Sequence, residues 1–410
     1  MCQNMRPPRK FIPDLHSLSF SKDGSLAAYA ISEAGSDWRK IVVIDAKTKE
    51  ILEQPIIDVK FSGISWKGNE GFYYSSYDKP SGSELSSKTD HHKLYFHKLG
   101  EHQSLDQVIF GELEGQKRRY VGGRVTEDAR YLILSGATST SGNDLFIQDL
   151  SSPNSALVTI LENTDHEAYV IDNSGSTLFI VTDMDAPNQR IISVDAKNPQ
   201  PENWIDFIPE TENVLSPSKG GGYFFAEYMI DALSRVYQYD YSGHLIREIP
   251  LPGMGSASAI TGKKEATTLY YSFSNYITPS TSFALDLQTN VSTVYQTSGV
   301  EFSSDNFVSK QDLLKLNKKF LNHNTNTDII TFDYSLNKAL KAEIFISMWA
   351  VETSALELNQ NIENETLRVI SHGALHCMGF KDKTAKEIKI IRQKEDEFIE
   401  MFHVKQKGNV

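Results

Sequence analysis

The sequence of 410 residues has only two cysteines, Cys2 and Cys377, so it cannot rely on a framework of disulfides. Cysteine use this sparse is typical of a reducing compartment, and we expect a cytoplasmic protein. No apolar run approaches the roughly 20 residues of a membrane-spanning helix. The start of the chain has a basic residue, Arg6, but no apolar run follows it, unlike a secretory signal peptide. We therefore expect no membrane partner.

Charge is unevenly spread along the chain. Residues 1–311 hold 27 Lys+Arg and 39 Asp+Glu, whereas residues 312–410 hold 14 of each, so the net charge of -12 lies entirely in the first part. An acidic region is a poor partner for nucleic acid, while a neutral one with local lysines can bind a phosphate backbone. A chain of this length is expected to form two domains. We place them at 15–311 and 312–410, after a tail of residues 1–14.

A polar turn followed by a short apolar or aromatic run recurs six times in the first domain, at steps of 46, 59, 47, 45 and 46 residues. A second marker, an apolar strand that ends in aspartate and a turn, recurs in phase with it. Two strands per period of about 46 residues, with room for two more, are typical of propeller blades. The long step contains a turn-rich insertion at residues 78–83. The first marker begins at Leu26, Phe72, Tyr131, Leu178, Tyr223 and Leu269, and the second ends at Asp45, Asp149, Asp195, Asp240 and Asp286.

The expected fold is therefore mainly β. We predict an incomplete six- to seven-bladed β-propeller, because the composition changes where the next blade should begin, followed by a truncated α+β metal-binding domain. Within the propeller, Gly220-Gly221-Gly222 is interpreted as a blade turn, since no helix start with Lys-Ser/Thr follows it. Asp90-His91-His92 is interpreted as an exposed polar loop in preference to a metal site.

Three segments of the propeller carry a resemblance to a known family. They are SWKGNEGFYYSSYD (residues 65–78), ELSSKTDHHKLY (84–95) and PETENVL (209–215). The part from 15 to 311 resembles the β-propeller of prolyl oligopeptidases, a serine peptidase family. In that family the propeller gates a separate α/β-hydrolase domain with the catalytic serine, aspartate and histidine. No Gly-x-Ser-x-Gly elbow occurs in the sequence, so serine peptidase activity is not expected. The resemblance implies at most a peptide-binding or gating module, and a plain interaction module is a further alternative.

The last hundred residues have a different pattern. Leu313, Leu314, Leu316 and Phe320 suit one amphipathic helix. Residues 329–332 and 343–346 are strand candidates, residues 365–376 indicate a helix with an apolar face, and a charged helix is expected from about Ala385 to Met401.

The chemistry of this region lies in the pattern His372-x-x-x-His376-x-x-Gly379-x-x-Asp382. Histidines at i and i+4 share one helix face, so both imidazoles can bind a single ion. A glycine three residues on suits the left-handed turn that ends a helix. Asp382 can then return as a third ligand. Three protein ligands leave a position open for water, which favours a catalytic zinc over a structural one.

A zinc peptidase is the obvious competitor. That class needs a glutamate beside the first histidine as its general base, and Gly373 stands there instead. Cys377 is predicted to belong to the core, not to the ligand set.

These residues carry a second resemblance. LNKKFLNH (316–323), TDIITF (327–332) and HGALHCMGFKDK (372–383) resemble the YbeY endoribonucleases, which mature ribosomal RNA. The resemblance implies that His372 and His376 are zinc ligands, with Asp382 where most members carry a third histidine. It implies a zinc-dependent endoribonuclease that acts on single-stranded or ribosomal RNA and is impaired by loss of the first third of its domain. Lys381, Lys383 and Lys386 are candidates for RNA contact, and no DNA partner is expected. The two resemblances, each truncated at the same point, indicate a fusion, and they favour an accidental join of two genes over a selected fusion of whole domains.

Overall fold

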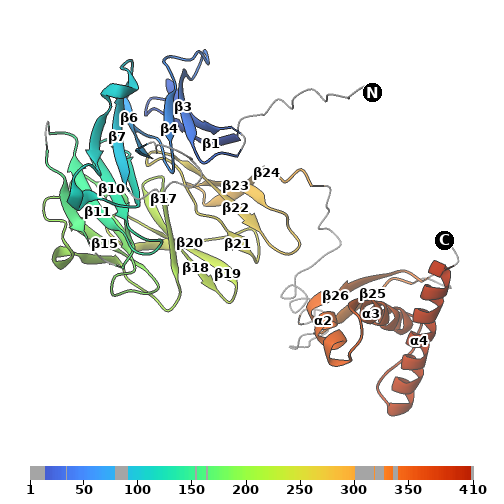
Figure 1. Ribbon diagram of the computed structural model, residues 1–410. Coiled ribbons are helices and arrows are strands. Elements are labelled where there is room, and N and C mark those ends of the chain that lie inside the picture. Colours follow the sequence, from blue (N-terminus) through green and yellow to red (C-terminus); the bar gives the residue numbers. More distant parts are fainter. Residues whose placement is uncertain are drawn as a thin grey trace, which may run out of the picture. The chain divides into compact units, whose positions relative to one another are not determined.

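The computed structural model describes residues 14–33, 35–78, 91–152, 155–162, 165–300, 318, 327–335 and 340–407 (Figure 1). The expected helix at residues 313–320 and most of the turn-rich insertion lie outside these ranges. The chain divides into two compact units, which are described separately. One comprises Met1–Leu251, Ser258–Tyr271 and Ala284–Thr293, and the other Pro252–Ala257, Ser272–Phe283 and Val294–Val410.

Six four-stranded sheets follow one another along the chain, each made of four consecutive strands. Their neighbouring strands run antiparallel in the first five sheets. The sheets are β1 (Asp14–Phe20) to β4 (Ile56–Val59) with β2 (Leu26–Ser32) and β3 (Arg39–Asp45); β5 (Ser65–Lys67), β6 (Gly71–Tyr77), β7 (His92–Lys98) and β8 (Gln107–Phe110); β9 (Tyr120–Val125), β10 (Tyr131–Ala137), β11 (Asp144–Asp149) and β12 (Val158–Leu161); β13 (Ala168–Ser174), β14 (Thr177–Thr182), β15 (Arg190–Asp195) and β16 (Ile205–Ile208); β17 (Leu215–Gly220), β18 (Tyr223–Ile230), β19 (Leu233–Tyr239) and β20 (Leu245–Ile249); and β21 (Ser256–Ala257), β22 (Thr268–Ser274), β23 (Thr281–Asp286) and β24 (Val291–Gln296). Short 3-10 helices occupy Gln103–Leu105, Glu114–Gln116 and Pro201–Asn203.

The first sequence marker corresponds to the second strand of each sheet, and the second marker to the third strand of every sheet but the second. The first marker begins β2, β10 and β18, and it starts at the second residue of β6, β14 and β22. The aspartate of the second marker stands at the turn into the fourth strand, where its carboxylate accepts backbone N–H groups. Asp45 accepts from Thr48 N at 2.7 Å and Asp286 from Thr289 N at 2.8 Å. These bonds lower the pKa of both aspartates, and they explain why this residue recurs with the blade period.

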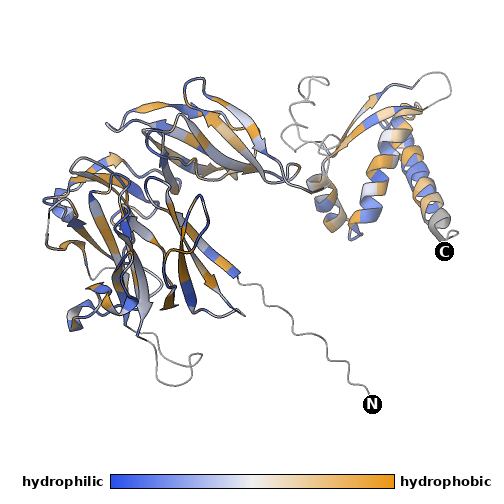
Figure 2. Cartoon of the chain, turned by 90° about the horizontal axis from the view of Figure 1, so that it is seen from above, coloured by the Kyte–Doolittle hydropathy of each residue, from blue (hydrophilic) through white to orange (hydrophobic). Residues whose placement is uncertain are grey.

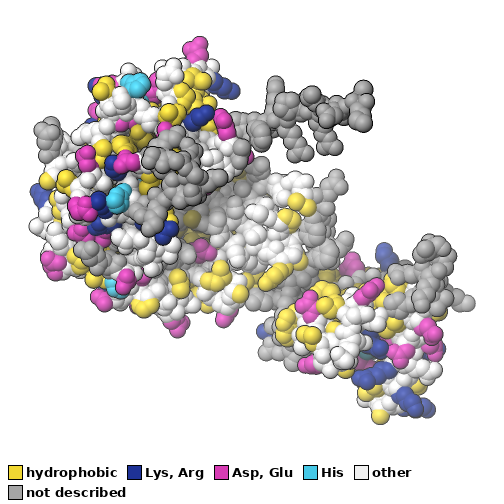
Figure 3. Space-filling view, in the orientation of Figure 1, with side chains coloured by type: hydrophobic (Ala, Val, Ile, Leu, Met, Phe, Trp, Pro, Cys, Tyr) yellow, Lys and Arg dark blue, Asp and Glu magenta, His cyan; other side chains and the backbone are white. Residues whose placement is uncertain are grey.

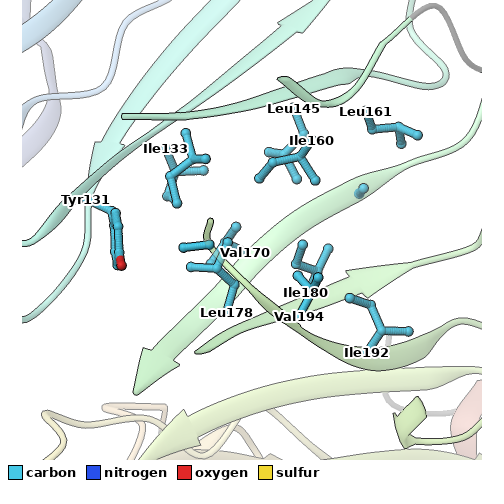
Figure 4. Close-up of a cluster of buried hydrophobic side chains, with 13 residues drawn as sticks. Tyr131, Ile133, Leu145, Ile160, Leu161, Val170, Leu178, Ile180, Ile192 and Val194 are labelled. Carbon is cyan, nitrogen blue, oxygen red and sulfur yellow. The ribbon is translucent and has the colours of Figure 1, made fainter. Parts of the chain in front are cut away.

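Buried aliphatic side chains fill the space between successive sheets. Figure 2 shows apolar residues distributed over the strands, and β10 and β14 carry them in continuous runs, YLIL and LFIV, because both faces of these strands are buried. In the cluster drawn in Figure 4, side chains from the third and fourth sheets meet. Leu178, Ile180 and Ile192 are each 0% exposed. Burial of such a side chain stabilises a fold by about 1.5–3 kcal/mol.

The first sheet leaves part of one face open to solvent. On β1, Leu18 is 52% and Phe20 55% exposed, and they pair with Tyr29 and Ala27 on β2. By contrast, β13 buries Ala168 and Val170 at the same place in its sheet. The open face is the surface on which a further sheet would pack in a closed ring. The fold class is therefore mainly β with an incomplete propeller, as expected.

Two histidines of the second sheet have structural roles. The prediction that His92 lies in an exposed loop is wrong, because it begins β7 and is 0% exposed. Its Nδ1 accepts a hydrogen bond from Val121 N at 2.8 Å, and its Nε2 lies 2.9 Å from Lys60 O. Burial lowers the pKa of His92 to about 4. The neutral ring thus serves two backbone groups that would otherwise be unsatisfied.

His97 lies between two buried carboxylates. Its Nδ1 is 2.7 Å from Asp106 Oδ1 and its Nε2 is 3.2 Å from Glu53 Oε1. Burial alone would lower the pKa of this histidine, but the two carboxylates outweigh burial and raise it to about 9. Asp106 also accepts a hydrogen bond from Tyr74 at 2.7 Å. The imidazolium therefore ties the end of the first sheet to the second.

The C-terminal part of the second unit, from residue 327 on, contains a two-stranded sheet and three helices among its described residues. Antiparallel β25 (Ile329–Asp333) and β26 (Ala342–Ile346) precede α2 (Met348–Glu357), α3 (Ile362–Cys377) and α4 (Ala385–Lys407). The two strands, α3 and α4 agree with expectation, whereas α2 has no counterpart in the sequence prediction. No helix in the described ranges combines the length and the apolar character that a membrane crossing needs.

We predict that the propeller loses stability at alkaline pH through His97. Its folded-state pKa of about 9 exceeds the ordinary value of 6.5, so its contribution is complete below pH 6.5 and vanishes as the pH rises through 9. The pKa shift of His97 corresponds to a contribution of at most about 3 kcal/mol to the free energy of unfolding. In urea unfolding, the deficit of His97→Gln relative to wild type should shrink between pH 6 and pH 10. His244→Gln, at an exposed site, should show no such change, and a deficit of His97→Gln that is independent of pH would contradict the prediction.

Candidate metal centre

Helix α3 places the two predicted histidines on one face. Its first turn is capped by Asn361, whose side chain accepts a hydrogen bond from Asn364 N at 2.7 Å. The helix ends at Cys377, and Gly379 follows with a φ of 93°. Phe380 N donates to Leu375 O at 3.0 Å, which satisfies one of the last carbonyls. The left-handed glycine reverses the chain, and this reversal brings Asp382 back beside the helix.

The structure brings all three predicted ligands together. The ligand atoms of His372, His376 and Asp382 lie within 4.8 Å of one another. The two Nε2 atoms are 2.9 Å apart. Asp382 Oδ2 is 3.8 Å from Nε2 of His372 and 3.7 Å from that of His376. All three side chains remain partly exposed to solvent, at 27%, 36% and 44% in the same order.

The other ring nitrogen of each histidine, Nδ1, lies within hydrogen-bond distance of an oxygen. Nδ1 of His372 lies 2.8 Å from Glu395 Oε1, and Nδ1 of His376 lies 3.0 Å from the backbone oxygen of Phe380. Because oxygen acceptors hold the proton on Nδ1, both Nε2 atoms carry a free lone pair. Two lone pairs that face each other at 2.9 Å repel unless a proton or a metal ion lies between them.

Glu395 is the buried partner that sequence reasoning missed. It comes from α4 and is 4% exposed. Arg368 compensates its charge, with NH1 3.3 Å from Glu395 Oε2, and also lies 3.0 Å from Asp396. The hydrogen bond to Glu395 raises the pKa of His372. No spacing rule points to a residue 23 positions after His372, so only the packing of α4 on α3 reveals the contact.

The donor set fits a zinc-like ion. Zinc–nitrogen bonds of about 2.0–2.1 Å at tetrahedral angles separate the ligand atoms by about 3.3 Å, close to the distances between the three side chains. Two neutral imidazoles and one carboxylate leave a fourth position for water or substrate. Carboxylate or carbonyl partners on the far ring nitrogen are usual for zinc-bound histidines.

Gly373 has a packing role. A Cβ at this position would lie 2.6 Å from Ile329 Cδ1 and 2.7 Å from Thr331 Oγ1, both on β25. The glycine thus lets α3 approach the sheet closely, next to His372. No carboxylate can occupy this place, where a zinc peptidase carries its general base.

The lysines named as candidates for RNA contact surround the ligands in sequence and are exposed. Lys381 and Lys383 flank Asp382, and Lys386 lies in the first turn of α4. Figure 3 shows basic and acidic side chains interspersed on the visible face of this unit. Cys377 is partly exposed and does not join the ligand cluster.

The propeller unit has a cavity of about 820 Å³, with turns of five sheets in its wall. Its charged groups are largely paired. Lys219 Nζ lies 2.8 Å from both Glu127 and Asp172, and Tyr241 donates to the same aspartate. Lys264 stacks over the ring of Tyr241 at 4.1 Å. These contacts join four sheets across the cavity but form no nucleophile–base pair.

Comparison with known proteins assigns the two parts of the chain to different families. Residues 4–298 match the prolyl oligopeptidase N-terminal β-propeller domain, and residues 280–403 match endoribonuclease YbeY. The prolyl endopeptidase of Elizabethkingia miricola is 50% identical over 311 residues, which cover 74% of this chain and 44% of that protein. The chain thus spans less than half the length of such relatives.

The C-terminal part and the fold have relatives of their own. The endoribonuclease YbeY of Flavobacterium johnsoniae is 45% identical over 100 residues, which are 24% of this chain and 72% of that protein. Among solved structures, a prolyl endopeptidase aligns with a TM-score of 0.67 and 26% identity, covering 82% of this chain and 46% of the other.

We predict that Gly373→Ala destabilises the C-terminal unit by about 1–3 kcal/mol, the usual cost of overpacking. The added methyl group would push α3 away from β25. Gly115→Ala is the matched control, because nothing lies within 4 Å of its Cβ position. Equal unfolding midpoints for the two variants in urea would show that the close approach of α3 to β25 at Gly373 does not affect stability.

Proposed function

Because the chain belongs both to the prolyl oligopeptidase propeller family and to the endoribonuclease YbeY family, we propose that its C-terminal part is a zinc-dependent endoribonuclease that cuts single-stranded RNA. The domain limits that we propose are 15–311 and 312–410. The RNA class that we propose is ribosomal, and the compartment is the cytoplasm.

One observation carries this proposal. The Nε2 atoms of His372 and His376 and the carboxylate of Asp382 converge, while Glu395 and Phe380 hold the far ring nitrogens. A bound zinc would lower the pKa of a coordinated water and stabilise charge that develops on the phosphate. The third ligand is aspartate where most relatives carry histidine, and carboxylate oxygen is an accepted zinc ligand.

The protein side chains would supply orientation and charge. Glu395 fixes the ring and the tautomer of His372, and the positive charge of Arg368 lies beside the buried Glu395. Lys381, Lys383 and Lys386 would contact the RNA backbone as cations. The C-terminal part is neutral overall, so binding would depend on these local charges and weaken as salt rises.

The propeller supports a second candidate function. Its cavity of about 820 Å³ has polar and apolar walls and is large enough for a peptide segment. We propose that this part acts at most as a peptide-binding or gating module. Hydrolysis of a prolyl peptide by the purified chain, unaffected by a chelator, would contradict this assignment.

The purified chain should contain about one zinc ion, and His376→Ala should lose the metal but keep its fold. Removal of one of three ligands leaves too few for tight binding. Metal analysis by mass spectrometry and circular dichroism measure the two properties. His244→Ala, which changes an exposed histidine of the propeller, is the control and should keep its zinc. Well-folded wild-type protein with far less than one zinc would contradict the proposal.

Glu395→Gln should weaken zinc binding by about 10- to 100-fold, the usual effect of losing a carboxylate behind a zinc-bound histidine. The amide retains the shape of the side chain but not its charge. Glu397→Gln is a control on the same helix, where the carboxylate contacts Lys394 and Gln393 and lies outside the ligand cluster. Competition with a fluorescent chelator gives both affinities. If the two variants bind zinc equally well, Glu395 does not support the site.

A further inference from the structure

A second feature of the C-terminal unit adjoins the ligand cluster. A cavity of about 640 Å³ lies between α3 and α4, and His372 and Asp382 form part of its wall. Asp328, which precedes β25, and Gln360, which precedes α3, also line it. This volume falls in the range of small-molecule sites and exceeds what one phosphate group needs. A substrate held at the ligand cluster would therefore have room for a further group beside it.

The walls of this cavity are rich in hydrogen-bond acceptors. Glu365 is 6% exposed and accepts a hydrogen bond from the Gln360 amide. Asp328 is exposed, and its carboxylate accepts a hydrogen bond from the hydroxyl of the neighbouring Thr327 at 3.3 Å. Burial raises the pKa of Glu365, and the charge of Asp328 adds to this effect. A ligand group that enters here must bring hydrogen-bond donors, not further negative charge.

Arg368, a basic residue in the cavity wall, already forms ion pairs with acidic side chains. Arg368 lies 3.3 Å from Glu395, 3.0 Å from Asp396 and 3.8 Å from Glu365, so its charge is compensated in place. Arg392 differs, because the described residues offer it no ion-pair partner. It is exposed on α4 at the cavity wall, one turn after Lys389. A phosphate would therefore bind near Arg392 and the ligand cluster, and an uncharged group would fill the interior.

Apolar side chains complete the walls. Val369 and Ile391 are 5% and 1% exposed, and Ile388 is 39% exposed. A flat group with donors on its edge and apolar faces suits this combination, and an unstacked nucleobase has this shape. Proteins read single-stranded RNA through such splayed bases.

We propose that the cavity binds the base next to the scissile phosphate and prefers bases with an exocyclic amino group over uracil. Carboxylates accept hydrogen bonds from the amino group of cytosine, adenine or guanine. Uracil presents carbonyl oxygens at the same positions, which the carboxylates of Asp328 and Glu365 would repel. This inference rests on the proposed endoribonuclease function and names the feature of the substrate that the same site reads.

Cytosine and uracil heptanucleotides test the preference. Both are unstacked pyrimidine runs, and they differ only in the groups on one edge of the base. Fluorescence anisotropy would measure their binding to the full chain in EDTA, where no cleavage occurs. We expect the cytosine heptamer to bind at least about fivefold more tightly. Asp328→Asn should bring this ratio close to one, as should Glu365→Gln, whereas Asp333→Asn, at the end of β25 and outside the cavity, should preserve it.

Equal binding of the two heptamers by wild-type protein, or tighter binding of uracil, would overturn the inference. The same protein with zinc would be tested for cleavage of a single-stranded RNA of mixed sequence. Cleavage without a base preference rejects the cavity as a base site and leaves the endoribonuclease function standing. Binding of neither heptamer, together with no cleavage, rejects both.

Discussion

Two imidazole nitrogens held 2.9 Å apart are the constraint on which the C-terminal part depends. Their lone pairs face each other because Glu395 and the backbone oxygen of Phe380 fix the protons on the opposite sides of the rings. The surrounding structure serves this geometry. Gly373 lets α3 lie close to β25, Gly379 turns the chain back, and Arg368 compensates the buried charge of Glu395. A metal ion bound here would relieve this repulsion and would keep one coordination position open.

In the propeller, by contrast, stability comes from many similar contacts that each contribute a small part. All six sheets repeat an apolar second strand, and five of them carry the same aspartate at the turn into the outer strand. Ion pairs join neighbouring blades, as between His97 and Glu53, or span the cavity, as between Lys219 and Glu127. None of these charged groups adjoins a nucleophile. The acidic propeller and the neutral C-terminal part therefore differ in chemistry as well as in fold.

Sequence reasoning predicted the elements that depend on local rules. The blade period was visible because the turn aspartates and the apolar strands recur with it, and the ligand cluster because histidines four residues apart share a helix face. Contacts between distant segments could not be predicted. Glu395 reaches His372 only through the packing of α4 on α3. His92 resembles a loop residue in the sequence, yet it is buried because two backbone groups of other segments need its ring. Helix α2 was missed because its apolar residues show no clear helical spacing.

We propose that His372, His376 and Asp382 bind one zinc ion, and that the two histidines bind it through the ring nitrogens that face each other. X-ray absorption at the zinc edge, on the purified full chain, tests it most directly. We predict a four-coordinate ion with two imidazole nitrogens and two oxygens, one from Asp382 and one from water, at about 2.0–2.2 Å. A sulfur ligand at about 2.3 Å, or a spectrum with no imidazole scattering, would contradict it.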